Sequence, residues 1–137
     1  MAYWLIKTEP ASWSWDDQMR KGVEGWNGVR NYQAANNLRA MKNGDLAFFY
    51  HSVSEKSIVG IVEVVREAYP DPTDASGKFV QVDVKTHKSF ARPVSLADIK
   101  ADSRFADLAL LRQSRLSVAP VDEASWQAIC AMGGVSA

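Results

Sequence analysis

A tryptophan lies in a segment whose composition suits contact with a flat ligand. Trp26 stands between Gly25 and the pair Asn27–Gly28, in a stretch without helical or strand periodicity, and Arg30 follows soon after. Glycines let a backbone approach a ligand closely, an indole face stacks on a planar ring, and an arginine pairs with phosphate. We therefore expect Trp26 to lie on a loop, outside the core, with its face toward a ligand.

Three other segments carry more polar residues than packing requires. They are residues 7–9 (Lys-Thr-Glu), 51–52 (His-Ser) and 112–115 (Arg-Gln-Ser-Arg), and each adjoins an apolar run or a predicted strand. Strand ends are where a sheet gathers polar groups around a cleft. A charged segment is more often a solvated surface than a site, so these segments become candidates through their combination with Trp26.

The sequence offers no metal-binding or nucleophile motif. Its two histidines, His51 and His87, and its one cysteine, Cys130, lack the spacing of metal ligands, and no glycine-rich phosphate loop or nucleophile-elbow serine is present. We expect no metal, no cofactor and no catalytic residue. Structural or surface roles are expected for His87 and Cys130, with Cys130 in the apolar stripe of the last helix.

Helices and strands must position these residues. Apolar and β-branched runs predict strands at residues 3–8, 46–50, 57–67, 79–86 and 116–118. Capping residues and helical spacing predict helices from Ser14 to Gly22, from residue 31 or 32 to about 40, and at 96–100, 104–111 and 122–132. Residues 69–72 should turn, Pro120 should end the last strand, and Gly133 should stop the last helix.

Composition sets the class of protein. The 137 residues include 16 Lys plus Arg and 16 Asp plus Glu, so the formal net charge is zero and any nucleic-acid site must be a focal basic patch. The elements predict one α+β domain over residues 1–137, with a small curved or barrel-like sheet and peripheral helices. No signal peptide or membrane span is evident, which predicts a cytoplasmic protein without membrane contacts, and we expect a monomer.

Long stretches of the chain resemble the EVE domain family. The resemblance rests on residues 3–10, 15–17, 26–34, 44–45, 49–52, 58–61, 69–71 and 110–117, and it covers the chain from residue 3 to about 129. It implies a PUA-like fold, a small β-barrel with peripheral helices, related to the YTH domains that hold a methylated adenine in an aromatic cage. One departure is Ala35, where the family commonly has an arginine that could contact phosphate.

The resemblance also implies a pocket for a modified base. It would use Trp26 as the stacking wall, with the other members at the end of the first strand, in the tryptophan loop and at the facing strand end: Lys7, Thr8, Gly28, Asn31, His51 and Ser52. Arg112, Arg115 and Ser117 would border this pocket.

The function expected from this pocket is recognition of a modified nucleobase without chemistry on it. The partner would be DNA or RNA that contains a modified base, with a modified cytosine as the best-supported class. The base would be flipped into the aromatic-walled pocket, with its methyl group against Val29, while Arg30, Arg112 and Arg115 contact phosphates.

Two alternatives stay open at this point. A small hydrolase of modified nucleosides could use Lys7 and Glu9, because alternate residues of a strand share a face. A protein-interaction module with a vestigial pocket would instead show no affinity for any base.

Overall fold

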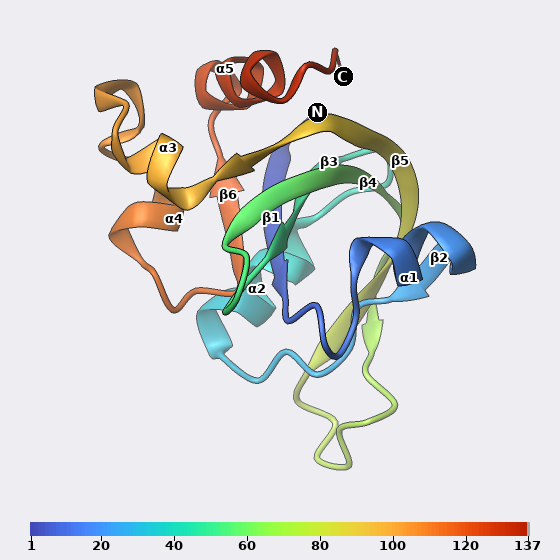
Figure 1. Ribbon diagram of the computed structural model, residues 1–137. Coiled ribbons are helices and arrows are strands. Elements are labelled where there is room, and N and C mark those ends of the chain that lie inside the picture. Colours follow the sequence, from blue (N-terminus) through green and yellow to red (C-terminus); the bar gives the residue numbers. More distant parts are fainter. Residues whose placement is uncertain (137) are drawn as a thin grey trace.

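The computed structural model describes residues 1–136. These residues form six strands, five α-helices and one 3-10 helix (Figure 1). The strands are β1 (Tyr3–Thr8), β2 (Val23–Gly25), β3 (Leu46–His51), β4 (Ser57–Pro70), β5 (Val80–Ser95) and β6 (Val118–Val121). The helices are α1 (Trp15–Lys21), α2 (Tyr32–Ala40), α3 (Leu96–Lys100), the 3-10 helix (Ser103–Phe105), α4 (Ala109–Arg112) and α5 (Glu123–Gly133).

All six strands belong to one sheet in the order β2-β5-β4-β3-β1-β6. The central strands β1 and β3 run parallel, and every other neighbouring pair is antiparallel. In the parallel pair Thr8 is opposite His51, so both strands end at the same edge of the sheet. That edge faces downward in Figure 1, where the loops after β1 and β2 also lie.

Both faces of the central strands are packed against apolar side chains. Along β1, Trp4 and Ile6 enter one cluster, whereas Leu5 between them enters the other. Leu38 of α2 belongs to the first cluster and Trp126 of α5 to the second. Successive side chains of a strand point to opposite faces, so a strand covered on both faces is apolar at every position. This explains the uninterrupted burial of β3.

Several predicted elements are confirmed. β1, α2 and α3 occupy the expected residues, β3 ends one residue later, and α1 begins at a capping box formed by Ser14 and Asp17. Asp122 caps α5 through the Ser125 N–H. Local sequence decides these elements, since capping and apolar spacing act over a few residues.

Other expectations were wrong where pairing with a distant strand decides the structure. β5 continues nine residues past the expected end at residue 86, because β4 supplies a partner as far as Ser95. The short strand β2 was not predicted, and it exists through its pairing with β5. The expected turn at residues 69–72 begins only after Pro70, which still pairs with Val80.

The C-terminal third also departs from the expected elements. The single helix expected at residues 104–111 is divided into a 3-10 turn and the short helix α4. The last strand begins at Val118, not at residue 116, and Pro120 lies within it. β6 is an edge strand, where a missing N–H can face away from the ladder. Helix α5 includes Gly133 and ends at Gly134, whose φ of 73° is left-handed.

The predicted α+β class is confirmed, but the expectation of a β-barrel is wrong. β2 and β6 are the two edges of the sheet and do not pair with each other, so the sheet stays open. Helix α2 contacts both β5 and β6, and it occupies the space that a pairing of the edges would close. Its buried residues Ala34, Ala35 and Leu38 join the cluster inside the curved sheet. Ala35 is therefore a core residue here.

A buried carboxylate fixes the loop after β2 to the hairpin between β4 and β5. Asp71 Oδ2 accepts hydrogen bonds from the Gly28 N–H at 2.8 Å and from Arg30 Nη1 at 3.1 Å. Its Oδ1 accepts from the backbone and hydroxyl of Thr73. Burial alone would raise the pKa of Asp71, but the hydrogen bonds from Thr73, Gly28 and Arg30 outweigh burial and lower the pKa to about 2.

This pKa predicts how Asp71 affects stability. A lowered pKa in the folded state stabilises the fold above the unfolded pKa of 3.8, and the contribution disappears as pH falls from about 4 to about 2. Asp71→Asn should therefore lower the free energy of unfolding at pH 7 by about 2 kcal/mol. The difference between the two proteins should shrink at pH 3, as measured by urea denaturation.

The matched control is Asp16→Asn, which removes an exposed carboxylate of α1. It should change the free energy of unfolding by less than about 0.5 kcal/mol. If the free energy of unfolding of Asp71→Asn stayed below that of the wild type by the same amount from pH 7 to pH 3, the ionic role of Asp71 would be contradicted.

Candidate functional site

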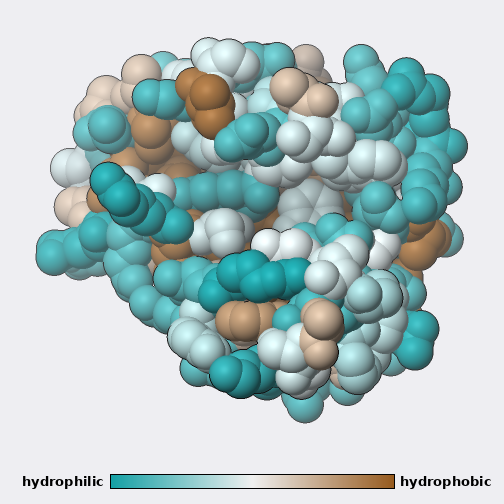
Figure 2. Space-filling view, turned by 90° about the horizontal axis from the view of Figure 1, so that it is seen from below, coloured by the Kyte–Doolittle hydropathy of each residue, from teal (hydrophilic) through white to brown (hydrophobic). Residues whose placement is uncertain are grey.

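A cavity of about 390 Å³ lies where the end of β1 meets the loop after β2 and the segment before β6. Figure 2 shows this side of the molecule, which is hollowed near its middle and bordered by hydrophilic and intermediate residues. Twelve residues line the cavity: Lys7, Thr8, Ser12, Trp13, Glu24, Gly25, Trp26, Asn27, Gly28, Val29, Arg30 and Ser117. Seven of the residues expected from the sequence are among them: Lys7, Thr8, Trp26, Gly28, Val29, Arg30 and Ser117.

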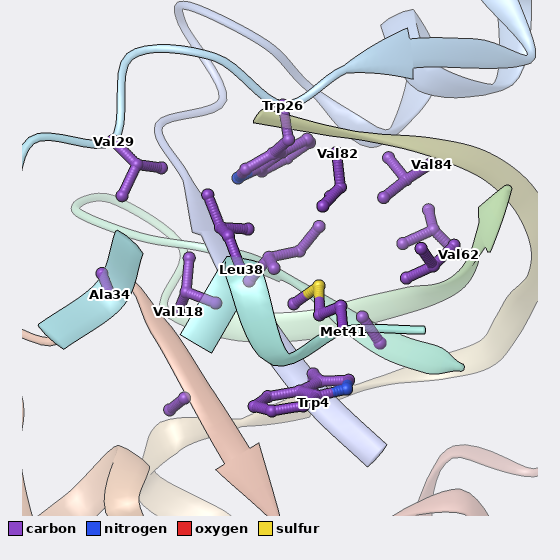
Figure 3. Packing of buried hydrophobic residues seen from close by; sticks show 14 of the residues in the cluster. Trp4, Trp26, Val29, Ala34, Leu38, Met41, Val62, Val82, Val84 and Val118 are labelled. Carbon is purple, nitrogen blue, oxygen red and sulfur yellow. The ribbon is translucent and has the colours of Figure 1, made fainter. Parts of the chain in front are cut away.

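Trp26 lines the cavity and is part of the core at the same time. Its backbone N–H donates to the Val82 carbonyl at 2.8 Å, and its ring packs edge to face against Phe49 with the ring centres 5.6 Å apart. Figure 3 shows the indole directed into the apolar cluster beside Val82. Only 7% of Trp26 is exposed, so the expectation that it lies outside the core was wrong. The loop is held by burial of this side chain, which fixes the position of the wall that Trp26 provides.

Trp13 provides a second indole to the cavity. It is half-buried, its Nε1–H donates to Gln18 Oε1 at 3.0 Å, and its carbonyl accepts the Thr8 hydroxyl at 2.9 Å. Trp13 was not among the residues expected at the site, because a large aromatic side chain most often serves to anchor a helix or fill the core. Its position after Pro10, between the polar end of β1 and α1, was the signal that could have identified it.

Lys7 joins β1 to the segment that precedes β6. Its ammonium donates to the Ser114 carbonyl at 2.8 Å, and its N–H donates to the Ser117 carbonyl at 2.9 Å. The ammonium also lies 5.8 Å from the centre of the Tyr50 ring. Burial lowers the pKa of Lys7, because removal from water disfavours the charged form. Lys7 therefore brings a partly desolvated cation and Ser117 to the same wall.

Glu24 brings a carboxylate to the lining of the cavity. Its Oε1 accepts from Lys21 Nζ at 2.7 Å and from the Gly25 N–H at 3.2 Å. The side chain is 23% exposed. Glu24 was missed because the strand that carries it depends on pairing with β5, whereas Gly25 was part of the segment selected around Trp26 without being named as a site residue. Asn27 lay inside the loop that the sequence selected, although it was not named as a site residue, and Ser12 had no signal.

Arg30 lies at the rim of the cavity. Its guanidinium donates to Asp71, to the Val29 carbonyl at 3.3 Å and to Thr73 Oγ1 at 3.0 Å. The guanidinium carbon lies 5.3 Å from the centre of the Phe79 ring. The side chain stays 41% exposed, so Arg30 presents a positively charged, positioned group to solvent.

His51 and Ser52 do not line the cavity, although β3 ends beside β1 as expected. His51 Nε2 accepts the Trp15 N–H at 3.0 Å, and Nδ1 lies 3.0 Å from Glu55 Oε2. The Ser52 N–H and hydroxyl both donate to the Thr8 carbonyl. These two residues fix the start of α1 and the end of β1. They therefore support the wall of the cavity without lining it.

Asn31, Arg112 and Arg115 also lie outside the cavity. Asn31 caps α2 by accepting the Ala34 N–H at 2.9 Å. Arg112 pairs with Asp107 at 2.6 Å and donates to the Ala106 carbonyl. Arg115 lines a second, smaller hollow together with Asn31.

The pair expected for a hydrolase does not form. Lys7 contacts the Ser114 carbonyl, while Glu9 is exposed, does not line the cavity, and offers its own carbonyl to the N–H groups of Ser12 and Trp13. Because β1 ends at Thr8, the alternation that would place Lys7 and Glu9 on one face stops before Glu9.

Within residues 1–136, no group of three or more His, Cys, Asp or Glu side chains is placed to hold a metal ion. Cys130 is buried in α5, where burial raises the pKa of its thiol to about 11. His87 is exposed on β5. No helix of the described residues is long and apolar enough to cross a membrane.

Comparison with known proteins places this geometry in a family. The family model described as EVE domain matches residues 2–132. Thymocyte nuclear protein 1 of Gallus gallus is 38% identical in an alignment of 160 positions, gaps included. The alignment covers 88% of this chain and 64% of that protein. The chain thus spans slightly less than two thirds of that relative's length.

Solved structures agree with this assignment. The NMR structure of Rpa0253 from Rhodopseudomonas palustris is 57% identical, with a TM-score of 0.93 and coverage of 98% of this chain and 94% of that chain. Human THYN1, solved in complex with DNA containing 5-methylcytosine, is 31% identical, with a TM-score of 0.93 and full coverage of both chains.

The expected relation to YTH domains is confirmed for the fold. The YTH domain of Zygosaccharomyces rouxii MRB1 protein has a TM-score of 0.62 at 15% identity, covering 96% of this chain and 85% of that one. Together with the match over residues 2–132 and the open curved sheet described above, these findings show that the chain belongs to the EVE domain family.

Proposed function

We propose that this protein binds nucleic acid that contains a modified base and holds that base, flipped out of its stack, in the cavity. The observation that carries the proposal is a cavity of about 390 Å³ with two indoles and several polar groups in its walls. Such a volume is typical of sites for small ligands. The likeness to human THYN1, whose structure contains 5-methylcytosine DNA, supports this class of ligand.

The walls suit a nucleobase. Trp13 and Trp26 line the cavity, and a base held there would stack on their indoles, which contributes about 1 to 3 kcal/mol per base. Carboxylates accept hydrogen bonds from the exocyclic amino group of cytosine, and Glu24 places one at the cavity. Lys7 and the Thr8 hydroxyl add polar groups at the end of β1. This set favours a base that carries both an amino group and a carbonyl, as cytosine does.

Val29 offers an apolar surface for a methyl group. It is 7% exposed and lies in the cavity wall beside the loop glycine. Burying one methyl group contributes only about 0.8 kcal/mol, so discrimination by the methyl alone is modest. Most of the affinity then comes from stacking and from contacts to the strand around the flipped base.

Arg30 and Arg115 are the arginines best placed to contact phosphates. The chain has no net charge, so attraction to a polyanion depends on local cations at the rim. Arg30 lines the cavity and Arg115 lines the adjoining hollow. Arg112, which the sequence suggested as a third, lines neither the cavity nor that hollow.

The direct test is a binding panel of oligonucleotides that differ in one base. At fixed salt, an oligonucleotide with one 5-methylcytosine should bind about three- to fivefold tighter than the same oligonucleotide with cytosine, as burial of one methyl group predicts. Fluorescence anisotropy measures both affinities. Equal affinity for every modified and plain base would contradict the proposal, and release of free base or ammonia from modified cytidines would favour the hydrolase.

A substitution in the wall tests the stacking role. Trp26→Leu should weaken binding of the methylated oligonucleotide by about 5- to 150-fold, because leucine fills part of the space without offering a face to the base. The variant should also lose stability, since Trp26 is 7% exposed and belongs to the core.

Trp4→Leu is the matched control for this loss of stability. Trp4 is also 7% exposed and belongs to the same cluster, but it does not line the cavity. It should lower the melting temperature while leaving affinity within about twofold of the wild type. If both variants weakened binding equally, the effect of Trp26 would reflect stability and not stacking.

The rim arginine is tested by salt dependence. Arg30→Ala should flatten the plot of log affinity against log salt by about 0.7 to 0.9 units, because one phosphate contact is lost. Arg112→Ala should leave the slope unchanged, since Arg112 lines neither the cavity nor the adjoining hollow. Identical slopes for wild type and Arg30→Ala would reject a phosphate contact at Arg30.

A further inference from the structure

A second hollow of about 290 Å³ adjoins the cavity. Six residues from two segments line it: Asn31, Gln33, Gln113, Ser114, Arg115 and Leu116. Leu116 is the one apolar side chain of this set, and the others present amides, a hydroxyl and a guanidinium. The hollow is therefore polar, with a positive charge on one side.

The cavity and the hollow share a wall. Arg30 lines the cavity and the next residue, Asn31, lines the hollow, while Ser117 lines the cavity and Leu116 the hollow. Consecutive α-carbons are about 3.8 Å apart, so the two spaces are separated by little more than one layer of chain. The hydrogen bond from Lys7 to the Ser114 carbonyl joins a residue of the cavity to a residue of the hollow. The two spaces are therefore neighbours on the surface, as adjacent nucleotides of one strand are neighbours in a bound ligand.

The side chains of the hollow are free to bind a ligand. Gln33, Gln113 and Arg115 are exposed, and their side chains make no hydrogen bond to any residue from 1 to 136. Asn31 uses its Oδ1 to cap α2, which leaves its amide hydrogens available. In the cavity, by contrast, Lys7, Thr8 and Arg30 all have partners within the protein.

We propose that the hollow binds the nucleotide next to the flipped base, and this rests on the proposed function of the cavity. Arg115 holds the phosphate, because a guanidinium forms paired hydrogen bonds with phosphate oxygens. Gln33 and Gln113 contact the edge of the neighbouring base, since carboxamides supply both a donor and an acceptor. The protein then prefers certain neighbours of the modified base, a property that the cavity alone does not provide.

The test uses oligonucleotides that contain one 5-methylcytosine and differ only in the base on its 5′ or 3′ side. Wild-type affinities should span at least fivefold among neighbours on one of the two sides. The double variant Gln33→Ala and Gln113→Ala should reduce that span to less than twofold and keep the preference for 5-methylcytosine over cytosine. Gln127→Ala, an exposed glutamine of α5, is the matched control and should keep the span.

The phosphate contact has its own measurement. Arg115→Ala should weaken binding by a similar factor for every neighbour and flatten the salt plot by about 0.7 to 0.9 units. Arg92→Ala, which alters an exposed arginine of β5 near the end of α5, should change neither. Unchanged affinity and slope for Arg115→Ala would overturn the assignment of Arg115.

The outcomes separate the two proposals. A wild type that prefers 5-methylcytosine but shows no neighbour preference, or a double variant that keeps the full span, overturns the role of the hollow and leaves the cavity intact. A wild type that does not distinguish modified from plain bases overturns the proposed function and the role of the hollow with it.

Discussion

The arrangement of the site depends on the packing of three aromatic side chains against the ring of Phe49. It is fully buried on β3, and the edges or faces of three other rings meet it at 5.0 to 5.8 Å: Trp15, Trp26 and His51. Trp15 begins α1 and so fixes the segment that carries Trp13, while Trp26 fixes the loop after β2. Edge-to-face packing of aromatic rings is directional, so it sets orientation as well as distance. Both indoles of the cavity are therefore positioned from one strand of the central parallel pair.

Parallel pairing of β1 and β3 is what brings this contact to the site. Parallel strands end at the same edge, where polar residues can meet, and both strands here are covered by apolar side chains on both faces. Around that edge the polar groups of the cavity are bound to the protein itself: Lys7 to Ser114, Thr8 to Trp13 and Arg30 to Asp71. Groups held in this way lose little conformational entropy when a ligand binds, which is a source of affinity that requires no additional contact. A ligand of this cavity would meet walls that are already in place.

The division between a preorganised cavity and a free polar hollow has a consequence for recognition. Stacking accepts any base, and one methyl group contributes little, so these two contacts by themselves select weakly. In the proposed function, selectivity would then depend on hydrogen bonds at the edge of the bound base and on contacts with the strand beside it. The free amides and the guanidinium of the hollow are placed to make those additional contacts. Such local groups matter because the net charge of the chain is zero and gives no general attraction to nucleic acid.

The amino-acid sequence alone was enough to predict the α+β class, the family, six of the elements to within a residue or so, and seven of the twelve cavity residues. These features depend on local properties, such as the Ser14 capping box and the apolar run of β3, or on long motifs like residues 26–34. Tertiary structure decided the rest. Glu24 reaches the cavity because β2 pairs with β5, a partner about sixty residues away that no local pattern announces. His51 is turned toward Trp15, and Arg112 toward Asp107, because the direction of a side chain is set by the groups that surround it in space. For the same reason the open sheet, with α2 between its edges, could not be distinguished from a barrel by strand count and spacing.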